Sequence, residues 1–396
     1  MKSEMKTKAL RFLSDIQTGP FGSQLHKEDY VDDGTPIVTV EHLGNRVFTE
    51  QNLPRVSNED KQRLSKYILK EGDIVFSRVG SVDRCSFVDS QHTGWLFSGR
   101  CLRVRPFEEI SPLFLYYFFC LESTKKFIRN IAVGATMPSI NTKLMGEIEV
   151  SYPDKQVQEK IANLLGAIDN KIELNNAIND NLQQQLLLLY ENIVKASSAT
   201  NKTALSALCA FQEGYVNPAQ THSEYFGGAV KWLRAVDINE SFIVETSRTL
   251  TRAGFESAKK SALLFKPNTI AISKSGTIGR LGIIAEYMCG NRAVINIAPN
   301  DASMLAFIYC FLKSKQKEFP DMAVGSVQKN LYVSLLEPLT VSIPDDKSLT
   351  MFNATGTSIL NAVHNNCIEN TKLIRLRDAL LPRLMSGELD VSAIEF

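Results

Sequence analysis

Two short segments combine a basic side chain, a small hydroxyl and a glycine after an apolar run. Phe76-Ser-Arg-Val-Gly-Ser-Val-Asp-Arg84 and Ile272-Ser-Lys-Ser-Gly-Thr-Ile-Gly-Arg280 share the pattern Ser-basic-x-Gly-Ser/Thr-apolar-x-Arg. Glycine lets a backbone approach a phosphate closely, and arginine can bind a phosphate or the O6 and N7 atoms of guanine with two hydrogen bonds. The pattern therefore indicates contacts to a nucleic acid. The alternative is a tight turn whose arginine pairs with a nearby carboxylate.

The candidate contact residues form two sets, one around each segment. Asn and Gln side chains suit the N6 and N7 edge of adenine, and a lysine such as Lys329 suits a phosphate. The first set is Ser77, Arg78, Gly80, Ser81, Arg84, Arg100, Thr136 and Asn141, and the second is Ser273, Lys274, Gly276, Thr277, Arg280, Asn291, Arg292, Gln328, Lys329 and Asn330.

The sequence lacks the motifs of the common catalytic sites. It has no Gly-x-x-x-x-Gly-Lys-Ser/Thr loop, no Gly-x-Ser-x-Gly elbow and no Asn/Asp-Pro-Pro-Tyr/Phe motif, which a methyltransferase places beside a flipped base. The five histidines show no metal-ligand spacing. We therefore expect neither catalytic residues nor a metal site. The alternative is an enzyme whose carboxylates, such as Asp73 and Asp83, come together only in the folded chain.

The chain consists of two related halves. Matches occur in the same order in both halves, and the shift between them changes by only a few residues, as loop insertions would produce. This order indicates an internal duplication. The matches place Gly19 on Gly214, Ile37–Leu43 on Trp232–Ile238, the two basic segments on each other, Gly99 on Gly290, Gly134 on Gly325 and Val150–Pro153 on Val341–Pro344.

Each half begins with a β-rich part and ends with a helical part. Short β-branched runs bounded by Gly, Pro and Asn predict strands, and the aromatic and aliphatic spacing of 112–129 and 303–317 predicts one shorter helix in each half. The fold class is therefore α+β, with a pseudo-two-fold repeat.

Two long helices are predicted, over 156–194 and 347–385. Apolar residues recur three and four apart in both, and both carry asparagine at the same two seam positions. Because a buried asparagine disfavours wrong registers, we expect the two helices to pack together. The alternative is that each helix lies on its own half of the chain, with the asparagines facing solvent. Pro382 is expected to kink or break the second helix and Gly387 to cap it. The seam is Ile161, Leu165, Ile168, Ile172, Asn175, Asn179, Leu182, Leu186, Leu189 and Ile193, with Phe352, Gly356, Ile359, Val363, Asn366, Asn370, Leu373, Arg377, Leu380 and Leu384.

Composition favours a cytoplasmic protein. The apolar stretch 113–121 is too short to span a bilayer, and the first residues lack the apolar core of a signal peptide. Seven cysteines without a Cys-x-x-Cys pair suit a reducing compartment and are expected in the core. The net charge is +1, with a slight basic excess in both β-rich parts, so any nucleic acid is expected to bind there.

The sequence resembles the specificity subunits of type I restriction-modification systems over essentially its whole length. The second half departs from the family pattern at Gly214-Tyr-Val-Asn217 and at Val327-Gln-Lys-Asn330, which suits two modules that read different DNA sequences. The motifs that carry the resemblance are Gly19-Pro-Phe-Gly-Ser23, Gly72-Asp-Ile-Val-Phe-Ser-Arg78, Gly134-Ala-Thr-Met-Pro-Ser-Ile-Asn141, Gln158-Glu-Lys-Ile161, Ile168-Asp-Asn-Lys-Ile172 and Leu380-Leu-Pro-Arg-Leu-Met-Ser-Gly-Glu388.

The resemblance implies a division of labour along the chain. Residues 1–153 and 199–344 would be two target-recognition domains, each reading half of a split site in double-stranded DNA. Residues 154–198 and 345–396 would contain conserved helices that form an antiparallel coiled coil, set the spacer and dock two methyltransferase subunits. Restriction subunits with nuclease and translocase activity would join the complex. S-adenosylmethionine would bind the methyltransferases, and this chain would hold no cofactor. The second interpretation is a coiled-coil scaffold, or another DNA-binding module outside restriction-modification.

Overall fold

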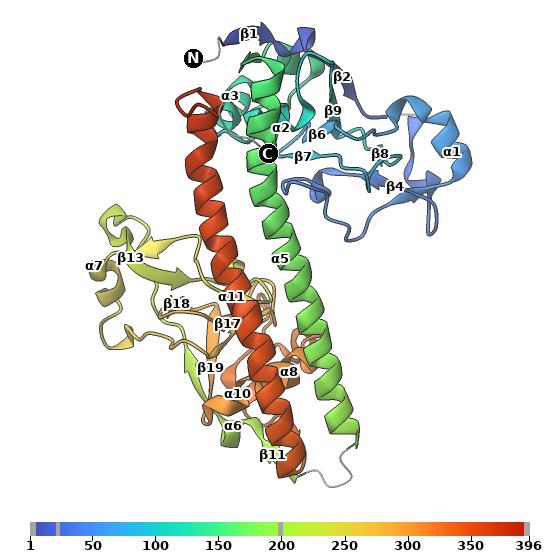
Figure 1. The fold of residues 1–396 in the computed structure, drawn as a ribbon. Helices are drawn as coiled ribbons and strands as arrows, with labels where there is room; N and C mark the ends of the chain where they lie inside the picture. Colours follow the sequence, from blue (N-terminus) through green and yellow to red (C-terminus); the bar gives the residue numbers. More distant parts are fainter. Residues whose placement is uncertain (1–4, 21–23, 197–200, 392–396) are drawn as a thin grey trace. The chain divides into compact units, whose positions relative to one another are not determined.

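The chain folds into two compact units. The computed structural model describes residues 5–20, 24–196 and 201–391, and Figure 1 labels their elements. Unit 1 comprises Met1–Asn170 and Ile374–Phe396, and unit 2 comprises Lys171–Leu373. Two long helices, α5 (Lys155–Ala196) and α11 (Asp346–Met385), contribute residues to both units.

Unit 1 contains an antiparallel four-stranded sheet in the order β2-β9-β6-β7. A second sheet has the order β3-β5-β4-β8, in which β4 and β8 are parallel, and β1 pairs with β10. The strands are β1 (Lys6–Ala9), β2 (Ser14–Thr18), β3 (Tyr30–Val31), β4 (Thr35–Val38), β5 (Arg55–Val56), β6 (Ile74–Ser77), β7 (Cys85–Phe87), β8 (Leu96–Phe97), β9 (Cys101–Pro106) and β10 (Glu149–Tyr152); the helices are α1 (Asn58–Arg63), α2 (Pro112–Cys120), α3 (Glu122–Ile131) and α4 (Thr142–Gly146).

Unit 2 repeats this arrangement. Its main sheet has the order β12-β19-β16-β17-β14, a second sheet has the order β15-β13-β18, and β11 pairs with β20. The strands are β11 (Asn201–Ala204), β12 (Cys209–Glu213), β13 (Phe226–Leu233), β14 (Phe242–Ile243), β15 (Thr249–Leu250), β16 (Ile270–Ser273), β17 (Leu281–Ile284), β18 (Cys289–Gly290), β19 (Val294–Pro299) and β20 (Thr340–Ile343); the helices are α6 (Leu205–Leu208), α7 (Arg252–Glu256), α8 (Leu305–Lys315), α9 (Phe319–Met322) and α10 (Val333–Leu336).

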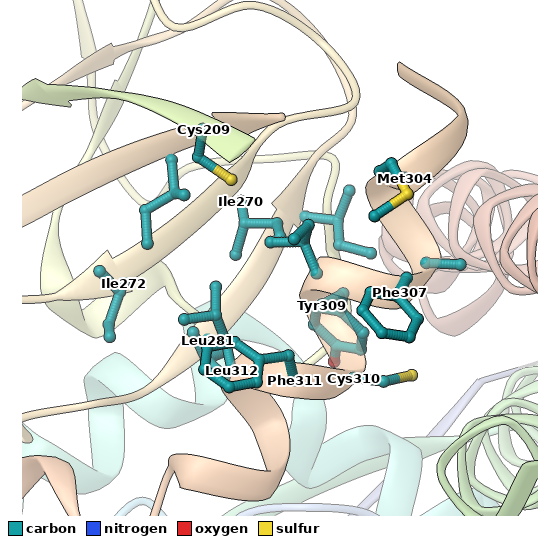
Figure 2. Close-up of a cluster of buried hydrophobic side chains, with 14 of the residues drawn as sticks. Cys209, Ile270, Ile272, Leu281, Met304, Phe307, Tyr309, Cys310, Phe311 and Leu312 are labelled. Carbon is teal, nitrogen blue, oxygen red and sulfur yellow. The ribbon is translucent and has the colours of Figure 1, made fainter. Parts of the chain in front are cut away.

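The inner strands β6 and β16 of the two main sheets are buried on both faces. In β16, Ile270 and Ile272 belong to the cluster that includes α8, while Ala271 lies in a separate cluster on the opposite face. This alternation follows from the two-residue period of a strand. Figure 2 shows side chains of β16 and α8 that belong to this cluster, among them Ile270, Ile272, Phe307 and Tyr309. The prediction of one helix over 112–129 was wrong, because Leu121 takes an extended conformation and separates α2 from α3.

Equivalent backbone hydrogen bonds confirm the duplication. Gly19 N donates to Cys101 O at 3.1 Å, and Gly214 N donates to Val294 O at 2.9 Å. A Cβ atom on either glycine would approach a carbonyl oxygen, that of Ser98 or that of Asn291, to within 2.3 Å. These contacts make Ser98 equivalent to Asn291 and Arg100 to Ala293. The predicted match of Gly99 with Gly290 was therefore wrong by two residues, because β8 and β9 are shifted by 193 from β18 and β19.

The two long helices pack against each other in antiparallel orientation, as predicted. Within unit 2, Asn175 Nδ2 donates to Asn370 Oδ1 and Asn366 Nδ2 donates to Asn179 Oδ1, both at 2.8 Å. Within unit 1, Arg377 Nη1 donates to Asp169 Oδ1 at 2.8 Å. Each seam asparagine thus pairs with the duplicate of the other. Asn175, Asn179 and Asn370 are buried and Asn366 is half-buried, so the alternative with asparagines in solvent was wrong.

One predicted seam position of α5, Leu189, lies outside the buried face of the helix. Leu189 is 39% exposed, whereas the next residue, Tyr190, is 6% exposed and packs against Phe307 and Phe352. The helix contacts the core of unit 2 here as well as α11, so its buried face departs from a strict heptad.

Pro382 does not end α11. The helix continues to Met385, and Gly387 follows it with a φ of +71°, as expected for a C-terminal cap.

The seven cysteines are all free thiols, five of them buried and Cys120 and Cys367 partly buried, as predicted.

Candidate nucleic-acid interface

The basic segment of unit 1 forms a turn at the end of β6. The buried Ser77 hydroxyl donates to Val79 O at 2.7 Å, and Arg78 N donates to Arg100 O at 2.8 Å. Gly80 has a φ of +76°, and a Cβ atom there would have no neighbour within 4 Å. Backbone conformation, and not packing, therefore requires glycine at this exposed position.

An exposed loop, residues 133–139, lies against this turn. Val133 and Ser139 exchange two backbone hydrogen bonds of 2.9 and 2.8 Å, which close the loop, and Gly80 N donates to Pro138 O at 2.8 Å. Ile140 N also donates to Arg78 O at 3.0 Å. The turn, Arg100 and the loop carrying Thr136 therefore form one continuous surface. We call the turn and the loop together the turn-loop surface.

Unit 2 builds the same turn-loop surface from 273–280 and 324–330. Lys274 N donates to Ala293 O at 2.7 Å, and Leu331 N donates to Lys274 O at 2.9 Å. Val324 and Asn330 close the loop with bonds of 3.0 and 2.9 Å. Gly276 has a φ of +77° and open space at its Cβ position, as Gly80 does.

Several predicted contact residues have local structural roles. Asn141 Oδ1 accepts from Leu144 N at 2.9 Å and caps α4, while Asn330 Nδ2 donates to Gln328 O at 3.0 Å. Arg84 donates to the carbonyl oxygen of Leu43, not to a carboxylate as the alternative interpretation held. Contact of Asn141, Asn330 and Arg84 with DNA therefore stays a prediction.

In unit 2, Ser273 is fully buried, and its hydroxyl accepts from Arg280 N at 2.8 Å and donates to Thr277 O. It stabilises the turn from inside. Asn291 Oδ1 accepts from Ala293 N at 3.0 Å. The predicted residues with exposed positions on or beside the two turn-loop surfaces are Gly80, Ser81, Arg84, Arg100, Thr136, Asn141, Gly276, Thr277, Arg292, Gln328 and Lys329.

Sequence reasoning missed residues at both turn-loop surfaces. Met137 is 62% exposed and Val327 is fully exposed, and an apolar side chain can contact the methyl group of thymine. In unit 2, Lys274 Nζ donates to Glu213 Oε1 at 2.8 Å and lies 4.8 Å from the Tyr332 ring centroid. The departure of Gly214-Tyr-Val-Asn217 from the family pattern was the available signal for this group, because Glu213 directly precedes it.

The carboxylates proposed for the enzymatic alternative do not converge. Asp73 is buried and accepts two hydrogen bonds of 2.7 Å from Arg105, while Asp83 accepts from Arg129 at 2.5 Å. Within residues 5–20, 24–196 and 201–391, no group of three or more His, Cys, Asp or Glu side chains could hold a metal ion.

The helices of the described part of the chain include none with the length and apolar character needed to cross a membrane.

The sequence matches the family model described as "Type I restriction modification DNA specificity domain" at residues 2–184 and 201–377. It is 24% identical to the type I restriction enzyme HindI specificity subunit of Haemophilus influenzae, covering 84% of this chain and 90% of that protein. It is 22% identical to the MjaIX specificity subunit of Methanocaldococcus jannaschii, covering 98% and 94%.

Among solved structures, the crystal structure of a type I restriction-modification S subunit from M. genitalium has a similar fold. The TM-score is 0.56 with 17% identity, over 96% of both chains. The family model covers most of this chain, once in each half. The chain therefore belongs to the family of DNA specificity subunits of type I restriction-modification systems, a non-catalytic family.

Proposed function

We propose that each β-rich part, residues 1–153 and 199–344, binds one half of a bipartite, asymmetric site in double-stranded DNA through its turn-loop surface. The observation that carries this proposal is the presence of the same exposed surface in both units, on equivalent backbone bonds but with different side chains. A shared backbone supports one mode of docking on DNA. Different side chains support two different base sequences, because base edges are read by side chains.

The helical parts, 154–198 and 345–396, set the gap between the half-sites and dock two methyltransferase subunits in this proposal. Seam asparagines paired in antiparallel register support the first role, because they fix how the two helices align. S-adenosylmethionine binds the methyltransferase subunits, restriction subunits complete the complex, and the assembly acts on DNA in the cytoplasm.

A selection experiment tests the proposal. The full chain is co-expressed with its methyltransferase, purified as a complex and incubated with a pool of randomised duplexes, and bound DNA is recovered from a mobility-shift gel and sequenced. We expect one bipartite sequence to be enriched, with a fixed gap. Binding without any enriched sequence, or none at all, would favour a scaffold that joins proteins.

The gap is tested by a paired deletion. Removing seven residues from α5, together with the seven facing residues of α11, shortens the helix pair by about 10 Å at about 1.5 Å per residue. We expect the enriched gap to shorten by roughly three base pairs, at about 3.4 Å each, while both half-sites persist. A change in the bases enriched would contradict the assignment of separate roles to the helices and the β-rich parts.

A further inference from the structure

The ammonium group of Lys274 is held on two sides. Its Nζ atom donates to Glu213 Oε1 at 2.8 Å and lies 4.8 Å from the centroid of the Tyr332 ring. Only 15% of the Lys274 side chain is exposed. A lysine that serves as a phosphate contact normally extends into solvent, whereas the charge of this one is neutralised by Glu213. The local geometry therefore does not favour Lys274 as a phosphate contact.

Glu213 is the better-placed group for an external ligand. Its Oε2 atom accepts from the Tyr215 hydroxyl at 2.6 Å, so each oxygen has one hydrogen bond within the protein. A carboxylate has about four acceptor positions, which leaves capacity for a further donor. Burial alone would raise the pKa of Glu213, but the hydrogen bonds from Lys274 and Tyr215 outweigh it and lower that pKa. The side chain is therefore an ionised acceptor at neutral pH, and it is 20% exposed.

At the equivalent described positions, unit 1 carries different side chains. The equivalent backbone bonds align Glu213 with Thr18, Lys274 with Arg78 and Tyr332 with Asn141. The carboxylate and both rings are therefore features of unit 2 alone, built on a backbone that the units share. A group needed to support the common fold would be expected in both copies. Its restriction to one copy favours a role that differs between the two copies.

We propose that Glu213 accepts a hydrogen bond from the exocyclic amino group of a base in the major groove, and that Lys274 and Tyr215 position its carboxylate. The inference rests on the proposed function and specifies what the surface of unit 2 recognises. Both the N4 group of cytosine and the N6 group of adenine present such a donor, and a carboxylate is suited to accept from it. A phosphate is not a suitable ligand for this group, because the ionised Glu213 carboxylate would repel it.

The test compares Glu213→Gln with the unaltered chain, each in complex with the methyltransferase. Binding is measured on the enriched duplex and on duplexes carrying each of the four base pairs at every position of the half-site read by unit 2. We expect Glu213→Gln to reduce the preference at one base pair about tenfold, within the usual range for a single contact, and to leave the other half-site unchanged. Whether the unaltered chain prefers cytosine or adenine at that base pair distinguishes the two donors.

Two further variants separate base reading from structural support. Lys274→Arg retains a donor to Glu213 and should keep the preference, whereas Lys274→Met should lose it. Thr18→Glu introduces a carboxylate beside Arg78 and should alter only the half-site read by unit 1.

The outcomes are distinct. Equal weakening of binding to all base pairs by Glu213→Gln would show a structural role and overturn the inference, and so would an unchanged preference. If the unaltered complex enriches no sequence, the proposed function itself fails.

Discussion

The seam of the long helices and the two turn-loop surfaces are both duplicated, yet the seam keeps its two asparagines, whereas the surfaces and the residues beside them differ between the copies. Asn175 and Asn179 recur as Asn366 and Asn370, and each bonds with the duplicate of the other. At the turn-loop surfaces, Thr18 and Arg78 are replaced by Glu213 and Lys274. Seam residues face one another, so a change in one copy removes a partner from the other. The surfaces face outward, so each can change independently.

Exchange of a whole recognition part gives the largest expected effect. Replacing residues 1–150 with those of another family member should change only the half-site read by unit 1. Because each mismatched base pair costs about 1–3 kcal/mol, several altered positions should weaken binding to the original site at least roughly 1,000-fold. Selection from a randomised pool measures both half-sites. If both half-sites changed, the two surfaces would not be independent.

Loss of one seam amide should cost less. Asn179→Leu leaves the Asn366 side chain without its partner in a half-buried position, and we expect a loss of about 1–3 kcal/mol in the free energy of unfolding, measured with denaturant. The double variant Asn179→Leu with Asn366→Leu should recover part of this loss, because neither amide is then left unpaired. Asn163→Ala, on the exposed face of α5, is the control and should change little. Additive effects in the double variant would contradict coupling across the seam.

The glycines of the turns should show that the two copies share a backbone. Gly80→Ala and Gly276→Ala each place a Cβ atom on a residue with positive φ, which costs about 1–2 kcal/mol. We expect similar losses of stability for both variants, measured by denaturation, and weaker binding at the matching half-site only. Gly227→Ala is a control for strain outside the turns, because Gly227 has a φ of +82° and open space at its Cβ position. A cost at only one turn would mean that the backbones differ.

The smallest expected effect is a pH dependence confined to unit 2. The pKa of Glu213 is lower in the folded chain than its ordinary value of 4.5, so its contribution to stability is complete above that value and is lost as the pH falls through the folded pKa. The difference in unfolding free energy between the unaltered chain and Glu213→Gln should therefore shrink as the solution is acidified below about 4.5. Thr18→Val, at the equivalent position of unit 1, should show a difference that does not vary over this range. A constant difference for Glu213→Gln would contradict the role of the ionised carboxylate.

The helix seam and the duplication could be predicted because they depend on periodic patterns. Apolar spacing from Ile161 to Leu182 and the recurrence of asparagine specify a buried stripe wherever the helices meet. The prediction was wrong at Leu189, where the core of unit 2 buries Tyr190 and shifts the contact face. The predicted match of Gly99 with Gly290 was wrong, because these two identical residues lie two positions apart in the alignment that the paired strands give. Strand register follows from backbone hydrogen bonds, which residue identity does not reveal.

The sequence alone determined that this chain carries two related units, paired helices, two basic strand-end turns and the motifs of its family, because each of these is a pattern along the chain. Only the tertiary structure decided which side chains share a surface. Glu213 and Lys274 lie 61 residues apart, and it is the pairing of β12, β19 and β16 that joins them. Contacts of this kind depend on strand order and register, so a side chain's neighbours cannot be inferred from its position in the sequence.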